Sequence, residues 1–377
     1  MASICGSPVC AGGKPKMKFT YTGDYVVRKD GVVELLTSGT LVFLEPKVID
    51  VFMVGGGGAG GSDARQTVGG LGGGGGGYTR TVRSFAATVN KAYPVTIGAG
   101  AEASRTVDKP TSGSTSFGDF SVVGGGSVQL NRSSSADYTV GASGGSGGGC
   151  GLYSKSTGGG GGSDGGSGGL GSGTGLPASG QGFTTKEFGE PTGKLYAGGG
   201  GGGTYISAQS PVYALGGAGG GGDGAWGAGA DRTQAAGAGV ANTGGGGGGG
   251  VGVGGVANII GGSGGSGIVC FREAAPLPEL AGTWRMHDRL YRPFENFTET
   301  QNFSVSTDNT PFVGCTQASF ETRALFLRTA AGNLNTYDFN ANTWTRNYKY
   351  WSFTVEQATA FTEQFRAWLA SNATKQA

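Results

Sequence analysis

Two short, almost continuously apolar segments stand far apart in the chain. The first covers residues 48–54 (VIDVFMV) and the second covers residues 268–271 (IVCF). Short apolar runs rich in β-branched residues are typical of strands that are buried on both faces. We therefore expect both segments to be strands of one core, which would hold together the two ends of everything between them.

The first 44 residues alternate more regularly between apolar and polar positions. Residues 17–27 (MKFTYTGDYVV) and 31–44 (GVVELLTSGTLVFL) are rich in Val, Phe, Tyr and Thr. Turn signals that contain glycine fall at positions 23–24, 29–31 and 38–39. The pattern predicts antiparallel strands, and residues 1–54 are expected to form an N-terminal β module.

Between the two apolar segments the pattern is dominated by glycine, because 76 of the 85 glycines lie between positions 51 and 270. A run of glycines has no side chain to bury and loses much backbone entropy when it is ordered. One ordered form suits such a run: the polyproline II helix, which has three residues per turn and can satisfy its backbone groups by bonding to neighbours. The runs are 55–58, 72–77, 158–162, 198–203, 219–222 and 244–250.

Sequence rich in glycine and serine is also typical of flexible linkers. Three features favour order here. The runs alternate with apolar segments such as 92–98, 117–123 and 256–260, the two apolar strands bracket the block, and a linker of this length would be exceptional in a compact protein. We therefore expect residues 55–272 to form an ordered block of packed polyproline-II-like strands.

Residues 280–377 differ in composition, with three glycines and most of the tryptophans. A proline-containing linker, residues 273–279 (EAAPLPE), precedes them. Strand-like segments are followed by a helix that is expected to open at Thr354, since the spacing to Gln357 is that of a capping box. The fold class predicted for the whole chain is therefore mainly β, ending in a small α+β domain.

Composition restricts the kinds of partner that the chain can bind. Charged residues are few and balanced, 27 basic against 25 acidic, which gives no electrostatic footprint for nucleic acid or an anionic membrane. The five cysteines are an odd number without tight paired spacing, a pattern that indicates assembly in a reducing cytoplasm. No window of about 18 apolar residues occurs, so we expect no membrane span.

Five segments, in order along the chain, resemble elements of the glycine-rich domain found in tail proteins of phages and prophages from Gram-positive hosts. They are 35–44 (LLTSGTLVFL), 48–61 (VIDVFMVGGGGAGG), 93–100 (YPVTIGAG), 113–118 (GSTSFG) and 261–271 (GGSGGSGIVCF). Residues 368–376 (WLASNATKQ) are similar to a small domain appended to such proteins, whereas residues 131–138 (NRSSSADY) are a polar insertion that departs from the family's pattern. The resemblance implies a component of the virion tail, often placed at its distal end.

A search for catalytic patterns gives no constellation of residues that could carry a reaction. His287 is the only histidine, and a lone histidine supplies neither a metal cluster nor a triad. The G-x-S-x-G pattern at 261–265 is expected by chance in a block of glycine and serine, and residues 189–194 (GEPTGK) are one residue short of a phosphate loop. We therefore predict no enzymatic activity, no cofactor and no metal.

Segments between the glycine runs carry aromatic residues beside polar ones. Loops at the ends of a rigid scaffold are where binding residues usually lie, and flat rings beside carboxylates suit sugar rings. The alternative is that the rings close the ends of the glycine block with an apolar layer. The candidate binding residues are Tyr205, Tyr213, Trp226, Asp223 and Arg232.

Two hypotheses about function follow. The first is a non-enzymatic tail-tip adhesin, which presents loops to a host cell-surface glycan or teichoic acid and joins other virion tail proteins, as a homo-oligomer in the tail. The second is a purely structural tail, fibre or baseplate component, in which the glycine block is a rigid scaffold. Both hypotheses place the protein in the virion tail.

Overall fold

The computed structural model describes residues 17–63, 69–129, 140–153, 158–171, 178–205, 214–227, 233–253 and 257–274, and five short strands nearer the carboxyl terminus. The chain divides into two compact units, Met1–Glu273 and Ala274–Ala377. The described residues are essentially all β, which confirms the predicted mainly β fold, and the helix among them is a single 3-10 turn, η2 (Glu187–Gly189).

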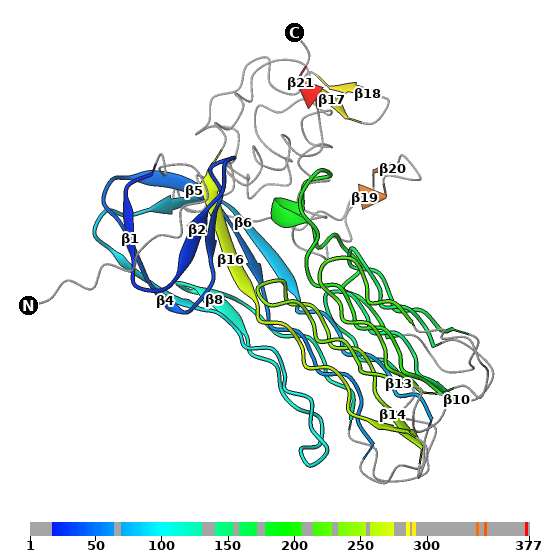
Figure 1. Ribbon diagram of the computed structural model, residues 1–377. Helices are drawn as coiled ribbons and strands as arrows, with labels where there is room; N and C mark the ends of the chain where they lie inside the picture. The colour runs from blue at the N-terminus through cyan, green and yellow to red at the C-terminus, as the bar shows by residue number, and fades with distance from the viewer. Residues whose placement is uncertain are drawn as a thin grey trace, which may run out of the picture. The chain divides into compact units, whose positions relative to one another are not determined.

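One end of the first unit is a sandwich of two five-stranded antiparallel sheets (Figure 1). The first sheet has the order β1-β4-β7-β8-β9, with β1 at Phe19–Tyr21, β4 at Gly39–Phe43, β7 at Ala92–Thr96, β8 at Thr115–Phe117 and β9 at Phe120–Val122. The second has the order β2-β3-β16-β5-β6, with β2 at Tyr25–Val27, β3 at Val33–Leu35, β16 at Ile268–Glu273, β5 at Lys47–Val54 and β6 at Thr79–Ala87. Strands from both sides of residue 54 therefore share these sheets.

Strands β5 and β16 are buried on both faces, which explains their almost continuously apolar sequences. Val51 and Met53 of β5 face the core between the two sheets, whereas Phe52 faces a second apolar cluster on the opposite side. The two strands pair antiparallel, from Val54 opposite Ile268 onward. This pairing confirms the expectation that the segments bracketing the glycine block belong to one core.

The predicted turns also occur. The turn signals at 23–24, 29–31 and 38–39 separate the four strands β1 to β4 in order. Residues 117–123, expected to be one strand-like segment, instead contain the end of β8, a turn and β9, with Phe117 opposite Phe120. Gly118 supplies the turn at φ +54°, a backbone conformation that side chains rarely adopt.

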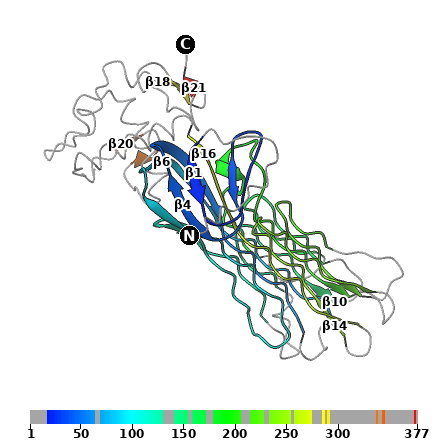
Figure 2. The same cartoon turned by 60° about the vertical axis from the view of Figure 1, so that its left-hand side comes forward.

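Away from the sandwich, the glycine runs lie side by side as extended chains (Figures 1 and 2). In the run 72–77, successive N–H groups donate to three different neighbouring runs in turn, and each neighbour is met again three residues later. The bonds, 2.7–3.2 Å long, are Gly73 to Gly149 and Gly76 to Ser146, Gly74 to Gly247 and Gly77 to Gly244, and Gly75 to Gly126 and Tyr78 to Val123. A period of three is that of the polyproline II helix, so the predicted packing is confirmed.

The run 244–250 lies in the interior of this slab of glycine runs and is bonded to six neighbours. From Gly246 to Gly250, its N–H groups donate to three runs and its carbonyl groups accept from three others. The bonds are Gly246 to Gly198, Gly247 to Gly58 and Gly248 to Gly237 as donors, and Gly222 to Gly246, Gly74 to Gly247 and Gly262 to Gly248 as acceptors. Backbone hydrogen bonds therefore hold this interior run in place on all sides.

This packing requires glycine because the backbones approach too closely for a Cβ atom. A Cβ atom added at Gly247 would lie 2.0 Å from the carbonyl oxygen of Gly262, and one added at Gly248 would lie 1.8 Å from that of Asp223. At the solvent-facing Gly160, by contrast, the nearest atom would be the Leu215 oxygen at 3.5 Å. The composition of the runs thus follows from the spacing between them.

A loop around η2, residues 183–197, covers the outer face of the second sheet and is held by ion pairs. Arg28 of the sheet contacts Glu187 at 2.7 Å and Arg272 contacts Glu190 at 3.0 Å. Between them, the buried ring of Phe188 lies under the Arg272 guanidinium, 4.2 Å from ring centroid to Cζ. We refer to residues 183–197 as the clamp loop.

Within the second unit, two small sheets are described. One has the order β18-β17-β21, with β17 at Trp284–Met286, β18 at Arg289–Tyr291 and β21 at Thr374–Lys375. The other pairs β19 (Tyr337–Asp338) antiparallel with β20 (Thr343–Trp344). The helix predicted from Thr354 lies outside the described residues.

Replacing one interior glycine tests whether backbone contacts hold the slab. We expect Gly247→Ala to lower the free energy of unfolding by more than about 1 kcal/mol, because its methyl group would meet the Gly262 carbonyl. Gly160→Ala is the matched control, for which we expect no loss, since that position is open. Denaturant titration measures both, and equal stability of the two variants would contradict the close packing.

The clamp loop gives a second prediction. Arg28→Met leaves the Glu187 carboxylate, whose side chain is 5% exposed, without its guanidinium partner. Leaving a buried charge unpaired costs about 3 kcal/mol, so the midpoint of urea unfolding should fall. The double variant Arg28→Met with Glu187→Gln should recover part of the loss, and a double variant less stable than Arg28→Met alone would show that the pair does not account for it.

Candidate functional site

The end of the slab far from the sandwich is where the predicted binding residues would gather. Two small sheets mark this end, β10-β11-β12-β13 and β14-β15 (Figure 1). Their strands are β10 (Leu152–Tyr153), β11 (Thr204–Tyr205), β12 (Trp226–Gly227), β13 (Thr233–Gln234), β14 (Val251–Val253) and β15 (Ala257–Ile259). The connections that start and end next to these two sheets include 64–68, 154–157, 206–213, 228–232 and 254–256.

The structure places Tyr205 and Trp226 on adjacent strands. They lie on the neighbouring parallel strands β11 and β12, where Tyr205 pairs with Gly227 and Trp226 pairs with Thr204. Tyr205 is half-buried and packs against Ala225 and Val251. This pairing places two aromatic residues at the point where the chain leaves the slab.

Trp226 is less accessible than a binding residue on a loop would be. Only 7% of it is exposed, so the ring fills the end of the slab, where glycine offers no apolar side chain. Its Nε1 is buried and has no hydrogen-bond partner in the part of the chain that the structure describes. An unpaired buried N–H costs about 1–3 kcal/mol, which makes this donor an unusual feature of the far end.

Asp223 forms hydrogen bonds within the slab. Its Oδ1 accepts a hydrogen bond from the N–H of Gly216 at 2.8 Å, and its carbonyl accepts from Gly237 at 2.7 Å. The carboxylate therefore fixes the turn between two runs. Tyr213 and Arg232 lie outside the described residues, in the connections that follow β11 and β12.

One buried residue at the far end was not singled out from the sequence. Asp63 is 2% exposed, and a Cβ atom added at Gly252 of β14 would lie 2.5 Å from its carboxylate oxygen. An isolated aspartate between a glycine run and a polar segment carries no pattern, so sequence reasoning had no signal for its burial.

A second polar cluster lies beneath the clamp loop. Glu34, Glu187 and Cys270 offer ligand atoms that all lie within 4.8 Å of one another. The Arg28 guanidinium contacts both carboxylates, at 3.2 Å from Glu34 and 2.7 Å from Glu187, and thereby supplies the positive charge that a metal would bring. Tyr196 donates to Glu187 at 3.4 Å.

The thiol in this cluster is not activated. Burial raises the pKa of Cys270 well above its usual range, and the nearby carboxylates of Glu187 and Glu34 raise it further. Zinc and nucleophilic chemistry both need the thiolate, which these surroundings disfavour. The arrangement is that of an internal ion-pair network that seats the clamp loop on the sheet.

The segment 189–194, which falls one residue short of a phosphate loop, also belongs to this structural network. Glu190 pairs with Arg272, and this guanidinium is the largest cause of the lowered pKa of the Glu190 carboxyl. Lys194 lies over the ring of Tyr196, 4.8 Å from its centroid. Glu190 thus holds the clamp loop to β16, whereas the contact between Lys194 and Tyr196 lies within the loop.

Comparison with known proteins identifies the slab and most of the sandwich as one domain. A membrane-spanning helix, which would have to be both long and apolar, does not occur among the residues that the structure describes. No curated protein matches the chain. The glycine-rich domain family matches residues 37–274, more than half of the 377 residues. This match runs from the turn before β4 to the residue after β16, and the chain belongs to the glycine-rich domain family.

Proposed function

We propose that this protein is a non-enzymatic tail component of a phage or a phage-derived particle, which displays loops that bind a host-surface glycan or teichoic acid. The observation that carries the proposal is the three-residue hydrogen-bond pattern of the slab. Each interior run is bonded on several sides, so the slab is a stiff spacer between the sandwich and the far end. A stiff spacer with connections grouped at one end is suited to display.

The far end supplies the binding chemistry that we propose. The connections 206–213 and 228–232 begin next to Tyr205 and Trp226 and carry Tyr213 and Arg232. Aromatic rings pack on the apolar faces of sugars, and a guanidinium binds phosphate or carboxylate groups of anionic polymers.

Affinity in this proposal comes from repeated copies. Binding of a glycan at one site is expected to have a free energy of about 4–8 kcal/mol, which corresponds to millimolar to micromolar dissociation constants. Several copies in a tail, associated as a homo-oligomer and attached to other tail proteins, raise the effective affinity without new contacts. The nearly balanced charge of the chain is compatible with short-range recognition rather than long-range electrostatic attraction.

A second candidate function is a purely structural tail, fibre or baseplate part. The burial of Trp226 and the use of Asp223 inside the slab favour it, because both residues have roles that need no ligand. In that case the far-end connections would contact neighbouring tail proteins.

The double variant Tyr213→Ala with Arg232→Ala separates the two functions, because it leaves the described slab residues unchanged. We expect at least a tenfold loss of binding to host cells or isolated wall glycopolymers, measured with purified fluorescent protein, and an unchanged melting temperature. The matched control is Lys18→Ala with Leu44→Ala, two exposed positions of the sandwich, which should bind normally.

If the double variant Tyr213→Ala with Arg232→Ala bound host cells as well as the wild-type protein, the proposed adhesin function would be contradicted. If particles carrying that variant also failed to assemble, the structural function would be supported instead.

A further inference from the structure

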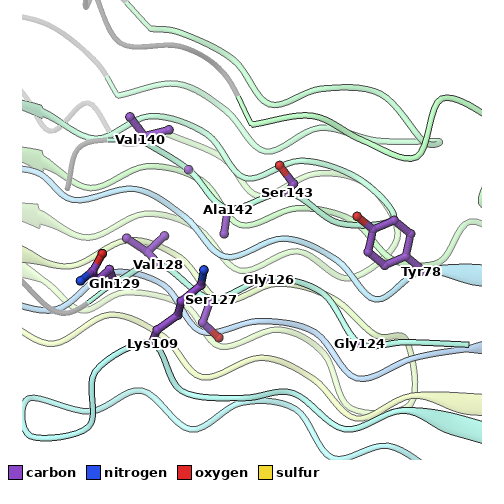
Figure 3. Close-up of a pocket in the computed structure, with 11 residues that line it drawn as sticks. Tyr78, Lys109, Gly124, Gly126, Ser127, Val128, Gln129, Val140, Ala142 and Ser143 are labelled. Atoms are coloured by element: carbon purple, nitrogen blue, oxygen red, sulfur yellow. The ribbon is translucent and has the colours of Figure 1, made fainter. Parts of the chain in front are cut away.

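A groove of about 520 Å3 runs along the flank of the slab (Figure 3). Its floor comes from two neighbouring runs, residues 124–129 and 140–143. Tyr78, at the start of the run into β6, lies at one end of the groove, and Lys109 lies on its rim. The groove is separate from the far-end connections discussed above and from the clamp loop.

The first run on the floor uses only part of its hydrogen-bonding capacity. The N–H groups of Gly125 and Val128, three residues apart, donate to Gly56 and Ala59 at 2.8 and 3.1 Å. The N–H of Gly126 donates to Ser143 at 2.8 Å. The third set, Gly124 and Ser127, has neither its N–H nor its carbonyl oxygen bonded to any described residue.

The second run has one donor that is not used. Ala142 and Gly145, again three residues apart, donate to Gly73 and Gly76 at 2.9 and 2.7 Å. The N–H of Ser143, which lines the groove, is not bonded to any described residue, whereas its carbonyl oxygen accepts from Gly126. We call the groups of Gly124, Ser127 and Ser143 that no described residue bonds open groups; those of the first run have the three-residue spacing that is used inside the slab.

Comparison with the interior shows what the groove lacks. The run 244–250 is bonded to six neighbouring runs. At Gly124 and Ser127 the run 124–129 has N–H and carbonyl groups that no described residue bonds, where an interior run meets further neighbours. Among the described runs, no polyproline II helix occupies this position beside the groove.

We propose that this groove binds an extended segment of a partner protein in the polyproline II conformation, rich in proline and glycine, which adds one more helix to the slab. A peptide can fill both sets of open groups, because it carries donors and acceptors at each turn. A polyanion such as a phosphodiester polymer offers acceptors alone and would leave the open carbonyl groups of Gly124 and Ser127 unpaired.

The remaining groove residues suit such a peptide. Proline-rich segments in this conformation commonly dock against aromatic side chains, and Tyr78 supplies one. At about 3.1 Å per residue, the floor from Gly124 to Gln129 accommodates about five residues of peptide. Proline fixes the required φ in advance, which lowers the entropy lost on binding, and glycine permits the close backbone approach seen elsewhere in the slab. This inference does not depend on the assignment to a phage tail.

The test uses the full-length protein labelled with nitrogen-15 and the synthetic peptide acetyl-(Pro-Gly-Gly)3-amide at millimolar concentration. We expect saturable shifts of the amide resonances of Gly124, Ser127 and Ser143. Acetyl-(Ser-Gly-Gly)3-amide is the control peptide, which should bind several-fold more weakly because it is not held in the extended form.

Variants of the floor then locate the site. Ala142→Tyr fills the groove and should weaken binding at least tenfold, whereas Ser143→Pro removes one open donor and should weaken it about fivefold, the effect of one hydrogen bond. Ser143→Ala keeps that N–H and serves as the control, and both position-143 variants must retain the wild-type melting temperature to be compared. If Ser143→Pro unfolds the protein, the peptide affinity of the Ala142→Tyr variant alone tests the proposal.

Three results would overturn the proposal. The first is the absence of shifts at the groove amides with the proline peptide. The second is equal binding by wild type and a folded Ala142→Tyr variant. The third is saturable binding of poly(glycerol phosphate) in the groove that Lys109→Ala abolishes, which would identify the groove as an anion site.

Discussion

The structure depends on one interaction, the backbone hydrogen bond between neighbouring glycine runs. In an ordinary core, side chains fill the space between elements and the hydrophobic effect drives their association. Here the chains approach until a carbonyl oxygen occupies the place where a Cβ atom would be, as at Gly247 and Gly248. Glycine also has the largest entropic cost of ordering, so the slab needs many such bonds together with a conventional core at its end.

The sandwich supplies that conventional core and holds the ends of the slab. Strand β5 leads into the first glycine run and β16 follows the last one, and their direct pairing fixes both ends of the block in one sheet. The clamp loop extends this arrangement, since it leaves the slab, packs Phe188 and Tyr196 against Phe52, and is held by Arg28 and Arg272. Side-chain packing therefore determines where the slab begins, and backbone bonding determines how it continues.

Much of this architecture could be read from the sequence, because its signals are local. Turn glycines marked the first four strands, and apolar content on successive residues identified β5 and β16 as strands covered on both faces. The period of the glycine runs followed from the lack of side chains.

What could not be predicted depends on contacts distant in sequence. Arg28 and Glu187 are 159 residues apart, so nothing local indicates their pairing. For Trp226 the sequence left two alternatives, a ligand-binding ring or a ring that closes the end of the slab, and only the structure shows that the ring is buried there. The groove beside residues 124–129 depends on which described runs lie next to it, which no local pattern can reveal.

Amide hydrogen exchange along one edge run tests the central claim most directly. In residues 124–128, the N–H groups of Gly125, Gly126 and Val128 are bonded to neighbouring runs, whereas no described residue accepts from those of Gly124 and Ser127. The account predicts slow exchange at the first three and fast exchange at the other two, a period of three, with protection of the bonded amides in the interior run 244–250. Alternating protection would indicate an ordinary β-strand, and uniform exchange at random-coil rates would indicate a disordered linker. Either result would contradict a slab built from polyproline II helices.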